Sequence, residues 1–424
     1  MPQRRRKVRK YSENAFVCVE CFNDEGMKAF CEAHAESKEC DFCGETGEEP
    51  IAAPLADVTD HINNTIHRFY DDPANAGLAY ETAEGGYQGT TWDSLEIFEE
   101  MGLEFPRDKN FKLANAIANG LDSEIWSEAE PYALSPDQQL RFSWEQFCHI
   151  IKHQRRFFFL HEKKSKRNRV HNEEELYSAS EILETIFSYA ERSNAFVTLK
   201  KGTSLFRARL QAPGEIHATA GAIGPPPNEH AIKTNRMSPP GVVMTYVADD
   251  RDTALAETAN KSGTFAIGEF VNDRELLILD LTQLPYSPSV FEELPDTMEE
   301  DPRLRLDFLH GVSREISRPI DRDDRVHVEY VPTQVVTEYI RTVIEIEGRQ
   351  VDGIRYRSSR RSAGTALVLF ADQRDLVFDV KAERPTFYRP DGRWLRLKKA
   401  ITVKVTPKDI KRWSVKPLRL FRAT

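Results

Sequence analysis

Residues 236–248 read RMSPPGVVMTYVA, and residues 253–257, shortly after them, read TALAE. A Pro-Gly turn runs into an apolar, strand-like stretch and then into a helix-like one, with polar side chains at the junctions. Two further stretches have the same character, LFRAR at 205–209 and DGIRYRSSR at 352–360. Because such junctions hold a few reactive groups on rigid elements, these three stretches predict the functional site.

The sequence around these stretches predicts strands and helices without a regular alternation. Ser178 and Glu181 form a capping-box pattern at the start of a helix, and Asp250 or Asp252 can cap the helix over 253–258. The other predicted elements are strands at 205–208, 242–247, 275–281, 353–356 and 366–370, and a helix from Tyr330 to Ile340. This mixture favours an α+β fold over regular βαβ winding.

The composition is that of an ordinary soluble chain. It has 424 residues, 40% hydrophobic and 30% charged, which predicts two or three domains. The net charge of −10 disfavours nucleic-acid binding, and the basic residues 4–10 predict a solvated tail, with a nucleic-acid or membrane-surface contact as the alternative. We see no signal peptide and no apolar run of membrane length, so we expect a cytoplasmic protein without a membrane partner. The sequence also lacks the Rossmann and P-loop phosphate-binding motifs.

Five of the six cysteines lie within residues 18–43. Four of them form two CxxC pairs: Cys18, Cys21, Cys40 and Cys43. A reducing cytoplasm argues against disulfides, and two such pairs at this separation suit a tetrahedral zinc ion with four thiolate ligands. Gly44 can relieve the turn after the second pair, whereas a ligand set that includes Cys31 and His34 is the alternative. Because four protein ligands close the site, the zinc is predicted to be structural.

Residues 57–160 carry helix-period patterns. Ser135, Pro136 and Gln138 suit the start of a helix, and its predicted core face consists of Leu140, Trp144, Phe147 and Ile151. A second amphipathic helix is predicted over 92–101, and a turn at 84–87. The charged residues 161–175 predict a linker.

The three stretches of the C-terminal half together resemble the RES domain family, over residues 200–385. The resemblance implies that Arg207 and Arg236 clamp the pyrophosphate of NAD, and that Tyr246 packs against the nicotinamide riboside. It also implies that Glu257 is the catalytic carboxylate and that Ser358 holds the ribose or the nicotinamide amide. Arg357 stands where the family commonly has proline. The weaker candidates are Arg209, Gln334, Arg355, Ser359 and Arg360.

The middle segment resembles the HEPN-like domain found ahead of RES domains. The matching pieces are residues 85–87, Trp92, residues 143–147 and residues 156–159. Arg156 and His161 have the spacing of the HEPN ribonuclease pair, but they lie about 140° apart on a continuous helix, so we interpret them as a degenerate or structural pair. The predicted organisation is a basic tail and zinc module at 1–50, a helical HEPN-like domain at 51–165, a RES domain at 175–385 and a C-terminal extension at 386–424.

The RES resemblance implies a mixed α+β domain similar to ADP-ribosyltransferase folds, and an enzyme that degrades NAD. It would cleave the nicotinamide–ribose bond by hydrolysis or phosphorolysis, as a toxin or an anti-phage defence effector. The transition state would be oxocarbenium-like, and Glu257 would stabilise this cation or orient the attacking nucleophile. The implied partners are NAD, a neutralising antitoxin or trigger protein, and further copies of the chain. The alternatives are a mono-ADP-ribosyltransferase, and a nucleic-acid-binding or RNA-cleaving protein that uses the HEPN-like and zinc segments.

Overall fold

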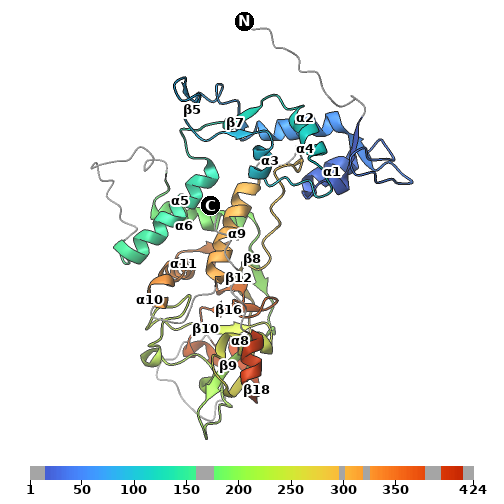
Figure 1. Ribbon diagram of the computed structural model, residues 1–424. Helices are drawn as coiled ribbons and strands as arrows, with labels where there is room; N and C mark the ends of the chain where they lie inside the picture. Colours follow the sequence, from blue (N-terminus) through green and yellow to red (C-terminus); the bar gives the residue numbers. More distant parts are fainter. Residues whose placement is uncertain (1–14, 159–175, 296–300, 319–324, 378–392, 414–424) are drawn as a thin grey trace. The chain divides into compact units, whose positions relative to one another are not determined.

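The computed structural model describes residues 15–158, 176–295, 301–318, 325–377 and 393–413 (Figure 1). The chain forms two compact units. The first contains the residues up to Gln139 together with Tyr286–Leu304, and the second contains Leu176–Pro285 and the residues from Arg305 onward, with Leu140–Arg169. The first unit therefore includes a segment from the second half of the chain, which the sequence patterns do not reveal.

The first unit is built on the cysteine-rich segment and a helical pair. Strand β1 (Phe16–Cys18) pairs antiparallel with β2 (Ala52–Pro54), and helices α1 (Glu25–Ala33) and α2 (Leu55–Ile66) follow the two strands. Asp24 caps α1 by accepting a hydrogen bond from the Met27 amide at 2.9 Å. One buried core joins these elements, and its largest side chains are Phe22, Met27, Ile62, Trp126 and Phe291.

The rest of the first unit contains more strand than the helix-period patterns predict. A three-stranded sheet has the order β3 (Tyr70–Asp71), β7 (Ile125–Glu128) and β6 (Trp92–Asp93). The predicted helix over 92–101 is wrong in its first half, because Trp92 and Asp93 pair with β7 and Asp93 Oδ1 then accepts the Glu96 amide at 2.9 Å. Only α3 (Glu96–Glu100) remains helical there, and α4 (Lys112–Ala118) follows it. The predicted turn is confirmed between β4 (Tyr80–Glu81) and β5 (Gly86–Tyr87).

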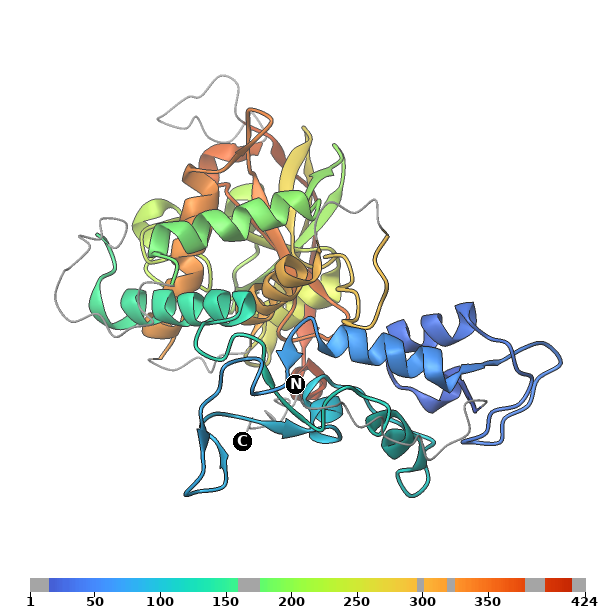
Figure 2. The same ribbon diagram turned by 90° about the horizontal axis from the view of Figure 1, so that it is seen from above.

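Two helices with predicted starts precede the large sheet. Helix α5 begins at Pro136 and ends at His149, where a π-helical segment, Ile150–Gln154, continues it. Leu140, Phe147 and Ile151 are buried, as the periodicity predicts, whereas Trp144 of the same predicted face is only half-buried. Helix α6 (Ala179–Arg192) has both halves of the predicted capping box between Ser178 and Glu181. The Phe187 ring of α6 stacks on Tyr339 of α11 (Val331–Thr342) at 5.4 Å between centroids, so the two helices lie side by side (Figure 2).

A nine-stranded mixed sheet forms the centre of the second unit. Its order is β17 (Leu376–Val377), β18 (Leu395–Val405), β11 (Gly263–Asn272), β9 (Ser204–Gln211), β10 (Thr245–Ala248), β16 (Thr365–Leu369), β15 (Gly353–Arg357), β12 (Leu276–Asp280) and β8 (Phe196–Leu199). The pairs β12–β15 and β17–β18 are parallel, and the other pairs are antiparallel. Such a sheet confirms the α+β class.

The ends of two sheet strands differ from the sequence expectation. Strand β10 begins at Thr245 rather than at Val242, because the residues directly after the Gly241 turn line a pocket instead of joining the sheet. Strand β18, from the segment predicted as a C-terminal extension, pairs with β11 along ten residues of that strand and is therefore part of the sheet. Helix α12 (Pro407–Trp413) follows it.

Candidate functional site

A large pocket of the second unit lies where two neighbouring strands separate. Strand β10 pairs with β16 through four residues but with β9 only through Ala248 and Phe206. The pocket beside this split has a volume of about 1250 Å³ and is lined from β9, β10, helix α8 (Arg251–Thr258) and the loop that precedes β10. Its volume exceeds the few hundred Å³ of many small-molecule sites, so a ligand of dinucleotide size fits.

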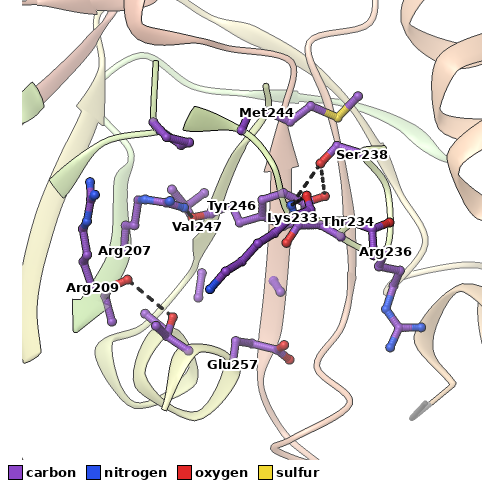
Figure 3. A pocket seen from close by; sticks show the side chains of 18 of the residues that line it. Arg207, Arg209, Lys233, Thr234, Arg236, Ser238, Met244, Tyr246, Val247 and Glu257 are labelled. Atoms are coloured by element: carbon purple, nitrogen blue, oxygen red, sulfur yellow. Dashed lines mark hydrogen bonds between the residues drawn. The ribbon is translucent and has the colours of Figure 1, made fainter. Parts of the chain in front are cut away.

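Arg207 connects the two separated strands. Arg207 and Arg209 lie on the same face of β9, because they are two residues apart (Figure 3). The guanidinium of Arg207 donates to Tyr246 O at 2.7 Å and to Ile223 O at 2.9 Å, and that of Arg209 donates to Ala222 O at 2.9 Å. Burial, followed by the charge of Arg209, lowers the pKa of Arg207 to about 10, so it stays charged at neutral pH. Arg207 lines the pocket, and two of its five N–H groups hold the backbone in place.

Glu257 is the carboxylate of the pocket. It lies in the last turn of α8, whose first turn is capped by Asp250 through the Thr253 amide at 2.9 Å. Ser358, directly after β15, donates from Oγ to Glu257 Oε1 at 2.5 Å. The same Oγ accepts the backbone amides of Arg360 at 3.1 Å and Arg361 at 3.2 Å. Because two donors already point at this oxygen, the hydroxyl proton is directed to the carboxylate.

The loop after β15 is attached to α8 by a second set of contacts. Arg361 Nη1 donates to both Asp250 oxygens at 2.8 Å and to Thr253 Oγ1 at 2.9 Å. A Cβ at Gly364 would lie 2.4 Å from Thr253 Oγ1, so only glycine permits this approach of loop and helix. The contacts fix Ser358 relative to Glu257, although 101 positions separate the two residues in the sequence.

Two tyrosines complete the wall of the pocket. Tyr246 Oη accepts the Met237 amide at 3.3 Å and lies 3.0 Å from Ser238 Oγ. Burial raises the pKa of Tyr246 to about 12. Burial, followed by the charge of Glu257, raises the pKa of Tyr356 well above its ordinary value. Both phenols are therefore neutral at physiological pH, and they line the pocket without adding charge. Sequence reasoning did not select Tyr356, because a tyrosine in a strand is most often part of the core.

Arg236 lines the same pocket but points elsewhere. Its Nη1 donates to Ile316 O at 2.7 Å, and its guanidinium lies 5.5 Å from the centre of the Tyr330 ring. Figure 3 shows this side chain directed away from Arg207 and Glu257. The structure thus brings Arg207, Tyr246 and Glu257 to one pocket, with Ser358 behind Glu257 and Arg236 at its edge.

Some of the weaker candidates hold segments next to the pocket in place, and the others line the pocket. Gln334 of α11 donates to Thr234 Oγ1 at 2.9 Å and to Asn235 O at 2.7 Å, so it supports the loop that carries Arg236. Arg355 pairs with Asp280 at 3.1 Å and with Asp249 at 3.4 Å. Arg357, at the position where the resemblance expects proline, donates to Thr282 O at 3.0 Å. The candidates that line the pocket are Arg209, Ser359 and Arg360.

Ser358→Ala is expected to lower the kcat of NAD cleavage, the reaction that the RES resemblance implies, about 10- to 100-fold, with KM changed less than twofold. Loss of one hydrogen bond to a charged group costs about 1.5–3 kcal/mol, and the unsupported carboxylate can rotate away from its working position. Ser359→Ala is the matched control, because Ser359 lines the pocket and the bond to Glu257 comes from Ser358. Steady-state kinetics of nicotinamide release checks both variants. A larger loss for Ser359→Ala than for Ser358→Ala would contradict the assignment.

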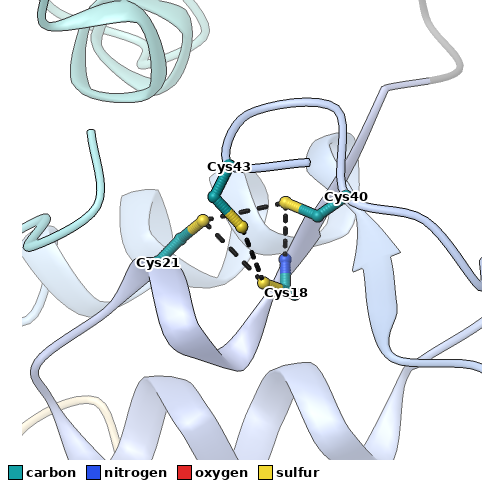
Figure 4. A group of neighbouring side chains, drawn as sticks. All are labelled: Cys18, Cys21, Cys40 and Cys43. Carbon is teal, nitrogen blue, oxygen red and sulfur yellow. Dashed lines mark hydrogen bonds between the residues drawn. The ribbon is translucent and has the colours of Figure 1, made fainter. Parts of the chain in front are cut away.

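The four cysteines of the two CxxC pairs come together in the first unit (Figure 4). All four Sγ atoms lie within 4.8 Å of one another, with Cys18 3.4 Å from Cys43 and 3.9 Å from Cys21, and Cys21 3.7 Å from Cys40. Zn–S bonds of 2.3 Å in a tetrahedron place sulfurs about 3.8 Å apart, so the group suits one zinc ion. Gly44 adopts the left-handed conformation after the second pair, with φ of +75°, as predicted.

Neighbouring residues support this cysteine group. The Cys18 amide donates to Cys40 Sγ at 3.4 Å. Arg107 bridges the two CxxC pairs, since its guanidinium contacts Glu20 and Glu45 at 2.7 Å each. The alternative ligands lie outside the group of four: Cys31 is buried in the core, and His34 Nδ1 lies 2.9 Å from Phe30 O.

The second half of the predicted HEPN pair cannot be placed. Arg156 is exposed, two residues beyond the π-helical segment, and His161 falls outside the described residues. The predicted linker at 161–175 lies outside them too.

The fold and the site define an α+β protein with a carboxylate-bearing pocket in a mixed sheet and a cysteine-rich N-terminal unit. Residues 204–392 match the family model of the RES domain, and residues 33–165 match that of HEPN/RES N-terminal domain 1. The two matches confirm the resemblances that the sequence stretches predict. No curated protein and no solved structure matches it. Among the described residues, none of the helices has the length and apolar character needed to span a bilayer.

Proposed function

We propose that the protein cleaves the bond between nicotinamide and ribose in NAD. The observation that carries the proposal is the Glu257 carboxylate, which lines a pocket of dinucleotide size and accepts a hydrogen bond from Ser358 at 2.5 Å. The match of residues 204–392 to the RES domain supports an NAD-related enzyme.

Cleavage of this bond requires from the protein mainly a fixed negative charge and a correctly positioned substrate. Nicotinamide leaves NAD from a pyridinium, so its departure needs no general acid. The ribose develops an oxocarbenium-like cation, which the fixed negative charge of Glu257 stabilises. Ser358 acts through Glu257 by holding one oxygen of the carboxylate, which orients this group toward the ribose or the attacking nucleophile. Tyr246 and Tyr356 supply neutral walls that limit water around the reacting sugar.

The acceptor of the ADP-ribose group is water or inorganic phosphate. Both give the same first product, nicotinamide, and they differ in the second. Transfer to a protein or nucleic acid, the mono-ADP-ribosyltransferase alternative, uses the same carboxylate. A toxin or anti-phage role, with a neutralising antitoxin or a trigger protein as partner, follows from the RES resemblance. The zinc ion is proposed as structural, held by Cys18, Cys21, Cys40 and Cys43.

The purified full-length protein is expected to release nicotinamide from NAD. The test incubates it with NAD in buffer with and without inorganic phosphate, and separates the products by chromatography. Free ADP-ribose in both buffers indicates hydrolysis, and an ADP-ribose phosphate that needs added phosphate indicates phosphorolysis. Release that requires an added protein or nucleic acid, with label transferred to it, favours the transferase. Absence of nicotinamide under all these conditions contradicts the proposal.

A further inference from the structure

The pocket is rich in cations, and its arginines Arg207, Arg209 and Arg236 are already hydrogen-bonded inside the fold. Arg207, Arg209 and Arg236 each donate to at least one backbone carbonyl, at distances of 2.7–2.9 Å. A donor directed at a carbonyl is not available to a ligand phosphate without a cost. Three donors of Arg207 and Arg236, the pair that the sequence assigns to the pyrophosphate, are therefore committed to backbone carbonyls in this arrangement.

Lys233 differs from these arginines. It lines the pocket, it is exposed, and its ammonium makes no hydrogen bond or ion pair among the residues that the structure describes. Figure 3 shows its side chain reaching across the pocket, with the ammonium between Arg207 on one side and Glu257 on the other. An ammonium on a long stem offers three donors to an incoming anion.

The backbone beneath Lys233 is held by a dedicated set of bonds. The Gly241 amide donates to Ala231 O at 2.7 Å, which closes the loop at its base. From helix α11, the buried side chains of Thr333 and Gln334 bind the next residues of the loop: Thr333 Oγ1 donates to Arg236 O at 2.6 Å, and Gln334 Nε2 to Asn235 O at 2.7 Å. A flexible lysine side chain on a fixed backbone can bind a ligand without deforming the pocket.

We propose that Lys233 binds the pyrophosphate of the dinucleotide and sets the affinity of the pocket for it. This inference rests on the proposed function, since it assigns the anionic part of that substrate. Lys233 and Glu257 line the same pocket, so the ammonium can bind the phosphates of a dinucleotide whose adjoining ribose faces the carboxylate. Arg207 and Arg236 then shape the strands and the loop around the ligand.

The test is a calorimetric titration of the full-length protein with ADP-ribose, which carries the pyrophosphate and lacks nicotinamide. Lys233→Met is expected to weaken binding about tenfold, and Lys233→Arg to keep it within about threefold of wild type. Lys201→Met, an exposed lysine outside the pocket, is the matched control and is expected to leave the affinity unchanged. Thermal denaturation verifies that all three variants fold. With NAD, Lys233→Met is expected to raise KM about tenfold and to leave kcat within twofold.

Two results would overturn the inference: wild-type affinity in Lys233→Met, or no binding of ADP-ribose by the wild type. Failure of the proposed function gives a different pattern. In that case the wild type binds ADP-ribose and loses affinity in Lys233→Met, yet it releases no nicotinamide from NAD.

Discussion

Glu257→Gln is expected to slow nicotinamide release from NAD by about 10²–10³-fold. The amide has the size of the carboxylate, and its oxygen can still accept the proton of Ser358, so the hydrogen bond after β15 is kept. What is lost is the negative charge beside the ribose, which the oxocarbenium-like transition state requires and the ground state does not. The effect should therefore fall on kcat, with little change in KM.

A matched control for Glu257→Gln lies on the same helix. Asp252 is an exposed carboxylate in the first turn of α8, away from the pocket lining, and Asp252→Asn is expected to keep the rate within about twofold. Steady-state assays of nicotinamide release compare the two variants with the wild type. Equal rates for Glu257→Gln and the wild type would remove the carboxylate from the mechanism. RNA cleavage that survives Glu257→Gln and is lost in Arg156→Ala would favour the alternative function.

Cys40→Ser is expected to remove the zinc and to unfold the first unit. Structural zinc contributes about 10–16 kcal/mol of binding free energy in small domains, whereas a whole domain is stable by about 5–15 kcal/mol. The cysteines are part of the core of this unit, together with Ile62, Trp126 and Phe291. Loss of the ion therefore exposes far more than the cysteine loops. Elemental analysis is expected to find one zinc per wild-type chain and none in the variant, with rapid proteolysis within residues 15–139.

Cys31→Ala is the control for this experiment. Cys31 is fully buried in the same core, but it lies outside the group of four sulfurs. The variant is expected to keep one zinc per chain and to lose only the modest stability of a truncated core side chain. Stoichiometric zinc in Cys40→Ser, or its loss in Cys31→Ala, would contradict the assignment of the ligands.

The first unit also contains a segment from the second half of the chain, which packs into its core. The segment Tyr286–Leu304 follows β12 in the chain and belongs to the first unit. Phe291 is buried there, and His61 Nε2 lies 2.8 Å from its carbonyl oxygen. A Cβ at Gly26 would lie 2.4 Å from the Glu292 amide, so α1 approaches this segment closely. No periodicity or spacing near residue 290 indicates such packing, because the partner residues are more than 200 positions away.

The sequence by itself determined the local features of this protein. Spacing alone was enough for the two CxxC pairs and for the capping box at Ser178, because each depends on groups within three residues of one another. For the cap of α8 the sequence left Asp250 and Asp252 open, and the structure has Asp250. The order of the RES-like stretches was likewise enough to predict an α+β domain with Glu257 at its site.

Only the tertiary structure decided which groups the side chains of the pocket contact. Arg207 meets the Tyr246 carbonyl 39 positions away, and Ser358 meets Glu257 at a separation of 101. These contacts depend on how β9, β10 and β15 are ordered in the sheet and on where β9 and β10 separate. Lys233 carries no motif, and its place in the pocket comes from the loop that α11 holds. Hydrogen-bond partners far apart in the chain are set by strand order and register, which a local pattern does not encode.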